Sequence, residues 1–304
     1  MTKSQTWKGN TGGGFLGQQG LIALFRLTGL RSLYFVMALV VPFYMLFSRK
    51  TYRAMYRFFR VRLGYSGWKS FISTYKNHFA FGQVILDRFA IFAGRKNLFE
   101  VEIIDEDFFY RLTSDSKGFI IAGSHAGNFE IAGYLLRPEG KVINALIYSG
   151  ETETVRRNRA KALGGNNVRI IPIADDMSHL FAAHAALQKG EAVSMSCDRS
   201  LGSSKVVTCD FFNGKADFPV GAFILSTHFA VEVAAIFVMK ESNRKYRIHI
   251  KSLTGAATPE DTPAENPTRR EQAERYTRLF AKELEAIVRQ YPMQWFNYHE
   301  FWKD

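Results

Sequence analysis

FIIAGSHAGNFEIAGYLL, at residues 119–136, joins two apolar runs through a histidine and an acid five residues apart, His125 and Glu130. The first run predicts a buried strand, the second predicts a helix, and Gly127 and Asn128 predict a tight turn between them. Reactive side chains in an α/β sheet lie beyond the carboxyl ends of its strands. The stretch therefore predicts a site in which the imidazole of His125 is a general base and Glu130 orients it. A loop with a capping histidine and a solvated glutamate is the alternative interpretation.

The sequence beyond Asp87 predicts the fold class. Short apolar runs alternate with helical patterns, which is typical of an α/β fold with a mostly parallel sheet flanked by helices. The predicted strands are residues 117–123, 141–147, 167–173, 191–197, 206–212, 232–239 and 245–250. The predicted helices are residues 128–137, 151–163, 176–189, 218–230 and 269–290. Apolar side chains of the last helix share one face, so we expect it to pack on the core.

Charge is distributed unevenly along the chain. Residues 1–86 hold twelve of the 40 Lys and Arg residues and none of the 28 Asp and Glu residues, so the net charge of +12 belongs to this segment. The basic residues flank an apolar stretch, RSLYFVMALVVPFYMLFSRK, at residues 31–50. Its aromatic residues are interleaved with aliphatic ones and do not form a polar stacking platform. This pattern favours anionic lipid over nucleic acid as the partner.

The apolar stretch predicts an N-terminal membrane-anchoring helical segment. Residues 32–48 carry no charge and include Pro42. A stretch of this length is at the short end of what crosses a bilayer, so it either spans as one helix or lies in the interface. A buried core helix is the third interpretation. If the helix spans, the basic residues that follow it place the C-terminal part in the cytoplasm; in either membrane arrangement they lie against the anionic leaflet.

Cysteine and histidine spacing indicates neither disulfides nor metal. Cys197 and Cys209 are the two cysteines, which fits a reducing compartment. The histidines lack the spacing of metal ligands. We therefore predict no metal and no cofactor.

Three stretches, in this order, resemble one family: HAGNFE at 125–130, DRSLG and VTCDFFNGKADFPVG within 198–221, and YPMQWFNYHEFWK at 291–303. The chain resembles the lipid A late acyltransferases, within the His-x4-Asp/Glu superfamily of glycerolipid acyltransferases, over nearly its whole length. The resemblance implies a membrane-associated enzyme at the cytoplasmic side of a bacterial cell inner membrane. It implies transfer of a fatty acyl chain from an acyl thioester, acyl carrier protein or CoA, to a hydroxyl of a lipid acceptor.

The predicted site follows from this reading. His125 and Glu130 are predicted to be catalytic, with His125 deprotonating the acceptor; the His-x4-acid pattern recurs at His299 and Asp304, where no strand precedes it. Backbone N–H groups of Gly127 and Asn128 are expected to hold the developing oxyanion. The predicted substrate-binding residues are Gly127, Asn128, Arg159, Asp198, Arg199 and Lys215. The predicted partners are acyl carrier protein, anionic membrane lipids and the lipid acceptor, with no nucleic acid.

The acceptor and the domain limits complete the expectations. Glu300 and Phe301 stand where the resembled family usually carries arginines, which would suit a phosphorylated sugar. The acceptor is therefore lipid A-like or, alternatively, an amino-acid-containing or other specialised bacterial lipid. A non-catalytic membrane-surface binding protein is the alternative of another class. We divide the chain into a basic, apolar anchor at 1–64, a helical connector at 65–114 and an acyltransferase α/β domain at 115–304.

Overall fold

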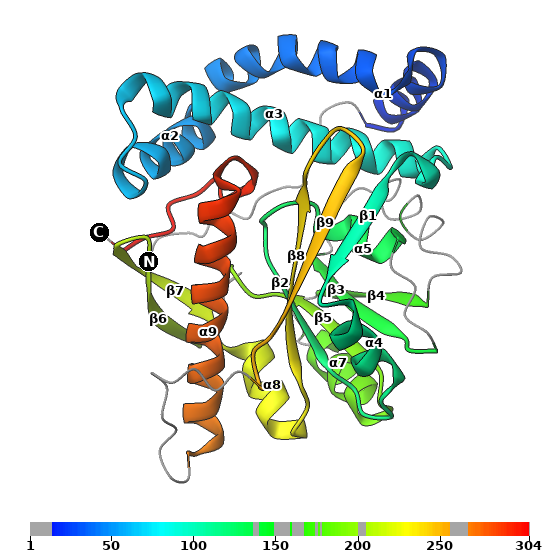
Figure 1. Cartoon of the computed structure of the whole chain (residues 1–304), viewed down its shortest axis with the longest axis vertical. Helices are drawn as coiled ribbons and strands as arrows, with labels where there is room; N and C mark the ends of the chain where they lie inside the picture. Colours follow the sequence, from blue (N-terminus) through cyan, green and yellow to red (C-terminus); the bar gives the residue numbers. More distant parts are fainter. Residues whose placement is uncertain are drawn as a thin grey trace.

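A seven-stranded sheet in the order β1-β9-β8-β2-β5-β3-β4 forms the centre of the computed structural model (Figure 1). The structure describes residues 14–135, 140–148, 159, 167–173, 176, 178–199, 205–255 and 267–303. The strands of the sheet are β1 (Glu100–Ile104), β2 (Ile120–Gly123), β3 (Ile143–Tyr148), β4 (Val168–Ile173), β5 (Ala192–Ser196), β8 (Val233–Lys240) and β9 (Lys245–Ser252). All neighbours are parallel except β8 and β9, which pair antiparallel. The predicted α/β fold with a mostly parallel sheet is confirmed.

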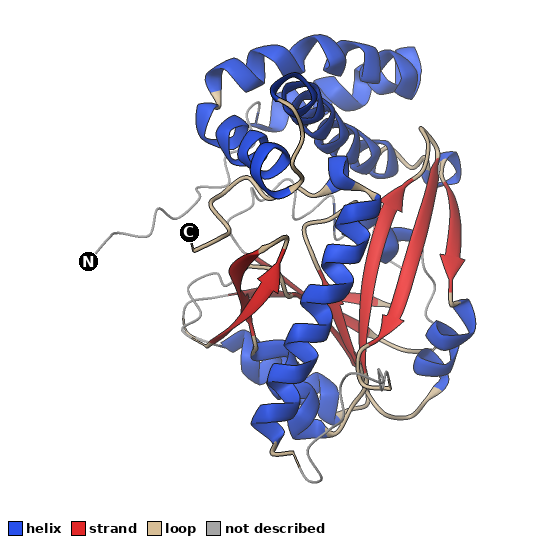
Figure 2. Ribbon diagram, turned by 60° about the vertical axis from the view of Figure 1, so that its left-hand side comes forward, coloured by secondary structure: helices blue, strands red, loops and turns tan. Residues whose placement is uncertain are grey.

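A separate two-stranded ribbon, β6 (Val206–Phe211) and β7 (Gly214–Pro219), lies beside the sheet (Figure 2). Its register pairs Phe211 with Gly214, so two residues make the turn, Phe212 and Asn213. Both have positive φ, 49° and 58°, as a type I′ hairpin turn requires. β7 and β1 were not among the predicted strands. Charged residues alternate along β1, whose Glu102 pairs with Lys245 and Arg247 of β9, and this hides an apolar signal.

Helices cover both faces of the sheet (Figures 1 and 2). They are α1 (Gly14–Phe47), α2 (Arg49–Arg57), α3 (Gly67–Phe92), α4 (Glu106–Ser114), α5 (Phe129–Leu135), α7 (Ser178–Gln188), α8 (Gly221–Phe229) and α9 (Arg269–Gln290), with short turns η1 (Phe58–Arg62), η2 (Lys96–Leu98) and η3 (Pro292–Gln294). The predicted helix at 151–163 lies outside the described residues, apart from Arg159. Thr268 and Glu271 form a capping box that starts α9. The apolar face predicted for this helix is buried, with Phe280 and Leu284 at 0% exposure.

Side-chain alternation along the central strands divides the core in two. On β8, Val233, Ala235 and Phe237 belong to the cluster that includes α7, α8 and α9. Ala234 and Ile236 of the same strand belong to the cluster that includes α1, α3, α4 and α5. The sheet is thus buried on both faces, which explains the continuous apolar runs of its inner strands.

Helix α1 lies against α3, and both cross one end of the sheet (Figure 1). Its last part, Leu27–Phe47, is a candidate membrane span by length and composition, with a mean hydropathy of 1.8 and 28% of the window buried. Gly29 interrupts the helical backbone (φ 78°, ψ 175°), and α3 approaches closely enough for Met37 to lie against Gly82. The other side of the helix forms what we call the apolar face of α1: Phe35, Val36, Leu39, Val40, Phe43, Leu46 and Phe47, each 47–80% exposed.

The segment after α1 returns to the core. Met55, Phe58 and Phe59 are at most 1% exposed, and they belong to the same cluster as α9 and Trp295 of the segment that follows α9. The Phe58 ring meets Trp295 edge to face at 4.9 Å and stacks on Trp302 at 6.0 Å. The domain boundaries at residues 64 and 114 stay a prediction.

Candidate active site

His125 lies just beyond the carboxyl end of β2, and the carboxylate that meets its imidazole is Asp198. Strands β2 and β5 are parallel neighbours in which Gly123 pairs with Ser196, so His125 and Asp198 are each two residues past that pair. The distance from His125 Nδ1 to Asp198 Oδ1 is 2.8 Å, and the backbone N–H of His125 donates to Asp198 Oδ2 at 2.8 Å. Ser196 Oγ also donates to Asp198, at 2.9 Å. The structure thereby fixes the imidazole from its Nδ1 side.

The two partners differ in exposure. The side chain of Asp198 is 2% exposed, whereas that of His125 is 35% exposed. Burial alone would raise the pKa of Asp198, but the interactions with His125 and Arg199 outweigh it and hold that pKa well below its usual range. Asp198 is therefore a permanent carboxylate at neutral pH, suited to hold Nδ1–H and to stabilise an imidazolium. Asp198 was predicted to bind substrate; the structure places it on the imidazole.

Glu130 does not take the place predicted for it. Its Oε1 accepts hydrogen bonds from Arg159 Nη2 at 2.7 Å and Arg88 Nη1 at 3.1 Å, and its Oε2 accepts one from Tyr134 Oη at 2.9 Å. Burial would raise its pKa, but the two arginines dominate and lower the pKa of Glu130 to about 2. Glu130 lies in the first turn of α5, and its side chain meets Arg88 of α3 and Arg159 instead of the imidazole. The predicted contact is corrected: the carboxylate that lies on the imidazole is that of Asp198.

The turn after His125 is held by backbone contacts on two sides. Gly127 N–H donates to Gln294 O at 2.7 Å, and Asn128 N–H donates to Val238 O at 2.7 Å. Gly127 has φ +69°, and a Cβ there would lie 2.0 Å from Val238 O, so this position requires glycine. Both N–H groups expected to hold an oxyanion are thus already bonded to carbonyls. Gly127 and Asn128 shape the turn in this structure.

The C-terminal tail wraps the site. Trp295 pairs with Ala126 as an isolated antiparallel bridge, and Phe296 N–H donates to His125 O at 2.9 Å. Farther along, His299 lies near Arg199, Asp198 and His125: burial first, and then the charge of Arg199, lower the pKa of His299 to about 4. Asp304, its predicted partner in a second His-x4-acid pattern, lies outside the described residues. His299 is thus a neutral neighbour of the site.

The other predicted binding residues are distributed unequally. Arg199 follows Asp198, and its Nη2 donates to Phe296 O of the tail at 2.7 Å. Arg159 joins the site through Glu130, with a side chain 3% exposed. Lys215 lies instead on the β6–β7 ribbon, where its exposed ammonium pairs with Asp210 at 2.6 Å. Arg199 and Arg159 are therefore in the buried surroundings of the His125 turn, whereas Lys215 is exposed on the ribbon.

The two thiols are poor nucleophiles. Cys197 is 1% exposed and Cys209 is 3% exposed. Burial raises the pKa of both, that of Cys209 to about 11. Within the described residues, no group of three or more His, Cys, Asp or Glu side chains could hold a metal ion. Among the described residues, the imidazole of His125, held by Asp198, is the group that we consider for chemistry at this site.

Asp198 could have been found from sequence by the rule that selected His125, since both follow predicted strands directly. What was missing was the strand order, which makes β2 and β5 neighbours. Arg88 had no such signal, because it lies within a long helix and only the packing of α3 brings it to Glu130. Gln294 was likewise missed, since its part depends on where the tail runs.

Three comparisons relate the chain to known proteins. The model of a family described as bacterial lipid A biosynthesis acyltransferase matches residues 72–304. No curated protein matches the chain. Among solved structures, it is similar to the 1-acyl-sn-glycerophosphate acyltransferase PlsC from Thermotoga maritima, with 12% identity, a TM-score of 0.37, and coverage of 84% of this chain and 98% of that chain.

Proposed function

This chain belongs to the bacterial lipid A biosynthesis acyltransferase family, and from that membership we propose that it moves a fatty acyl chain from an acyl thioester to a hydroxyl of a lipid acceptor, with His125 as the general base. The observation that carries the proposal is the 2.8 Å contact between His125 Nδ1 and Asp198 Oδ1, made by an imidazole that is 35% exposed. With Nδ1–H held by a buried carboxylate, Nε2 is the nitrogen that takes a proton.

The proposed reaction has two proton transfers. His125 Nε2 removes the proton of the acceptor hydroxyl as its oxygen attacks the thioester carbonyl. The C–O bond forms, the C–S bond breaks, and the imidazolium returns its proton to the leaving thiolate. The charge of Asp198 stabilises the imidazolium between these steps. No acyl-cysteine is needed, in keeping with the raised pKa of both thiols.

We infer that Glu130 acts on substrate binding and not on the imidazole. Its carboxylate brings Arg88 and Arg159 together, on side chains 16% and 3% exposed. Guanidinium groups gathered in this way suit an anionic group of the acceptor or the donor. Arg199, three positions after the end of β5 and bonded to the tail, is a further cation that we assign to substrate.

The acceptor is proposed to be a membrane lipid, either lipid A-like or an amino-acid-containing or other specialised bacterial lipid. Glu300 pairs with Arg57 of α2 at 3.3 Å, so an acid neutralises one arginine beside the tail. This arrangement favours an acceptor with less phosphate than a lipid A precursor. Efficient acylation of a phosphorylated lipid A precursor by the purified protein, at the rate seen with other lipids, would contradict this preference.

We propose that the protein lies on the cytoplasmic side of the bacterial inner membrane, with α1 in the interface. The apolar face of α1 is uncovered while its opposite side packs on α3, an arrangement that suits a helix lying in the plane of the membrane. Trp68 and Phe71, 73% and 40% exposed, extend the apolar surface at the start of α3. Arg49, Lys50, Arg53 and Arg60 follow α1 and would meet anionic headgroups or an acidic acyl carrier protein.

The test is acyl transfer by the full-length protein in anionic vesicles. Acyl carrier protein or CoA carrying a labelled acyl chain is offered with a bacterial lipid extract, and products are read by mass spectrometry. We expect one lipid class to gain one acyl chain with wild-type protein and not with His125→Ala. Equal product from wild-type protein and folded His125→Ala would end the proposed mechanism.

A further inference from the structure

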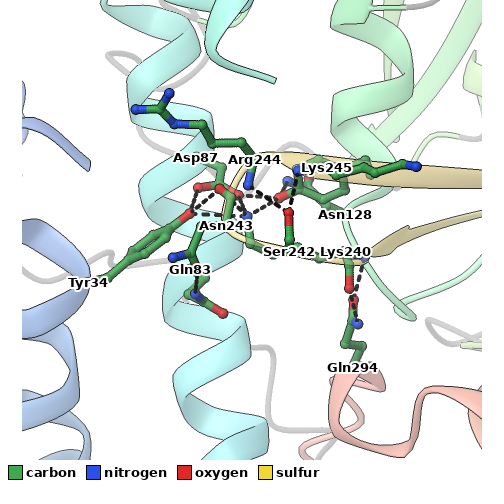
Figure 3. Close-up of polar contacts among 11 residues, drawn as sticks. Tyr34, Gln83, Asp87, Asn128, Lys240, Ser242, Asn243, Arg244, Lys245 and Gln294 are labelled. Atoms are coloured by element: carbon green, nitrogen blue, oxygen red, sulfur yellow. Dashed lines mark hydrogen bonds and ion pairs between the residues drawn. The ribbon is translucent and has the colours of Figure 1, made fainter. Parts of the chain in front are cut away.

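A buried ionic cluster lies behind the catalytic turn, where α1, α3, β8 and β9 meet (Figure 3). Asp87 of α3 is 0% exposed and forms an ion pair of 2.5 Å with Lys240 Nζ, at the end of β8. The hydroxyls of Tyr34 (α1) and Tyr246 (β9) both donate to the carboxylate of Asp87. We call these four residues the Asp87 cluster.

The polar groups of the cluster satisfy one another. Lys240 Nζ also lies 3.1 Å from Tyr34 Oη, 3.3 Å from Tyr246 Oη and 3.2 Å from Asn243 O. A buried ion pair of this kind adds little stability over apolar side chains of the same volume. Its distinctive effect is geometric, because a carboxylate with three donors allows one arrangement of the side chains around it.

One connection from the cluster reaches the catalytic turn through Tyr246. The Tyr246 hydroxyl donates a hydrogen bond to Asp87, so its oxygen is available as an acceptor. Asn128 Nδ2 donates to this oxygen at 3.2 Å. Asn128 is 3% exposed and directly follows Gly127 at the end of the turn. Asp87 thus holds the Tyr246 hydroxyl that receives the Asn128 amide.

A second connection runs through the backbone of Lys240. Gln294 brackets this residue, accepting from Lys240 N–H at 2.8 Å and donating to Lys240 O at 2.8 Å (Figure 3). The backbone carbonyl of Gln294 accepts a hydrogen bond from the N–H of Gly127 at 2.7 Å. Lys240 thus reaches the turn by two routes. Its ammonium lies against the Tyr246 hydroxyl that accepts from Asn128, and its main chain binds Gln294, whose backbone carbonyl accepts from Gly127.

We propose that Asp87, Lys240 and Tyr246 are positioning residues for the turn that carries His125. The proposal rests on the proposed function, since it assigns these residues to the geometry of His125 and not to contact with substrate. Tyr34 is a peripheral member, because its hydroxyl reaches Asp87 without contacting Asn128. The turn is short, so a displacement at Asn128 moves the imidazole three residues earlier relative to the substrate.

The first test is a double-mutant cycle between Asn128 and Tyr246 in the acyl-transfer assay. We expect Tyr246→Phe to lower kcat by about 10- to 100-fold, the effect of a misplacement near 1 Å, and to leave KM for the acyl thioester unchanged. Asn128→Ala should give a similar loss, and the double variant should be no worse than the worse single variant. Tyr34→Phe is the matched control: it removes a hydroxyl from the same carboxylate and should change kcat much less. Thermal melts establish that the variants are folded.

A second measurement needs no substrate. Diethyl pyrocarbonate modifies exposed neutral imidazoles, and peptide mass spectrometry reads the rate at His125 against pH. We expect the rate of His125 modification, followed against pH, to differ from wild type in Tyr246→Phe and to stay as in wild type in Tyr34→Phe. Asp87 itself is not substituted, since removing it would leave Lys240 buried without its counter-ion.

Each outcome has one meaning. Multiplicative kcat losses in the double variant, or an unchanged His125 curve in folded Tyr246→Phe, would overturn the positioning role. If wild-type protein transferred no acyl chain, the proposed function would fail, and the diethyl pyrocarbonate comparison would still decide the positioning role.

Discussion

The carboxylates of Asp198 and Glu130 lie in different surroundings. Asp198 faces one imidazole nitrogen and a backbone N–H, whereas Glu130 faces two arginines and a tyrosine. Both are held ionised, because these contacts outweigh the cost of burial. In the proposed reaction, the first arrangement stabilises a charge that appears on the imidazole; the second pairs with charges that are always present.

Substitution of the three residues should separate these tasks. His125→Ala is expected to lower turnover by about 10²–10⁴-fold, the usual contribution of a general base. Asp198→Asn should lower turnover by a comparable factor, because the amide no longer holds the same tautomer. Glu130→Gln should have a smaller effect on kcat, with a raised KM and a lower melting temperature, since Arg88 and Arg159 lose their counter-ion. Steady-state kinetics and thermal melts check this ranking. A Glu130→Gln variant as inactive as His125→Ala, with unchanged KM and melting temperature, would return Glu130 to the chemistry.

Two elements at the edges of the fold decide how the site meets its surroundings. Helix α1 presents an apolar face outward, and the tail after α9 pairs with the turn that follows His125. We expect the first element to meet lipid, whereas the second holds the backbone of this turn. Each can be tested without altering His125.

Charge placed on the apolar face of α1 should weaken membrane binding. Leu39 and Phe43 are 57% and 65% exposed, so Leu39→Glu with Phe43→Glu adds two charges without disturbing the core. We expect much less protein to float with anionic vesicles, because the acidic side chains oppose insertion and repel the headgroups. The control is Phe181→Glu on α7, which is 77% exposed in another part of the molecule and should float like wild type. Equal loss in both proteins would contradict the assignment of α1.

The tail should make stability depend on pH through His299. The pKa of His299 in the folded protein is about 4, below the ordinary value of 6.5, so the unfolded chain binds more protons between these values. The contribution of His299 to the free energy of unfolding is therefore complete above pH 6.5 and is lost as the pH falls toward 4. His299→Gln should lose less stability than wild type over that interval. Urea unfolding of both proteins at several pH values measures the difference, and parallel curves would show that His299 is not half-buried as the structure has it.

At the scale of the whole molecule, one segment carries both the excess charge and part of the core. Residues 1–86 hold twelve basic residues and no acid, and they include the apolar face of α1, yet Phe58 and Phe59 of the same segment are buried with Trp295. The surface that we propose for membrane contact therefore belongs to a segment that also packs on the core.

This difference in burial predicts unequal losses of stability from two apolar substitutions. Phe59→Ala removes a fully buried ring and should lower the free energy of unfolding by about 3–5 kcal/mol. Leu39→Ala, on the apolar face of α1, should change it by no more than about 0.5 kcal/mol. Chemical denaturation in detergent compares the two. A Phe59→Ala protein as stable as wild type would mean that this segment does not pack on the domain.

The sequence alone determined the features that depend on local pattern. Each of the seven strands predicted from apolar runs is present in the structure. The periodicity of residues 269–290 predicted the buried face of α9, and the end of one predicted strand located His125. The charge count located the basic segment. In each case neighbours within a few residues contain the information, since strand and helix periods are local properties.

Only the tertiary structure decided which groups meet. Asp198 reaches His125 from 73 residues away because β5 lies beside β2, and no spacing in the chain fixes that order. Arg88 reaches Glu130, and Gln294 reaches Gly127, through the packing of a helix and of the tail. The His-x4-acid spacing suggested a pair, but a charged side chain turns toward whichever opposite charge the fold brings near it. For Glu130 that charge is on two arginines, and for His125 it is on Asp198.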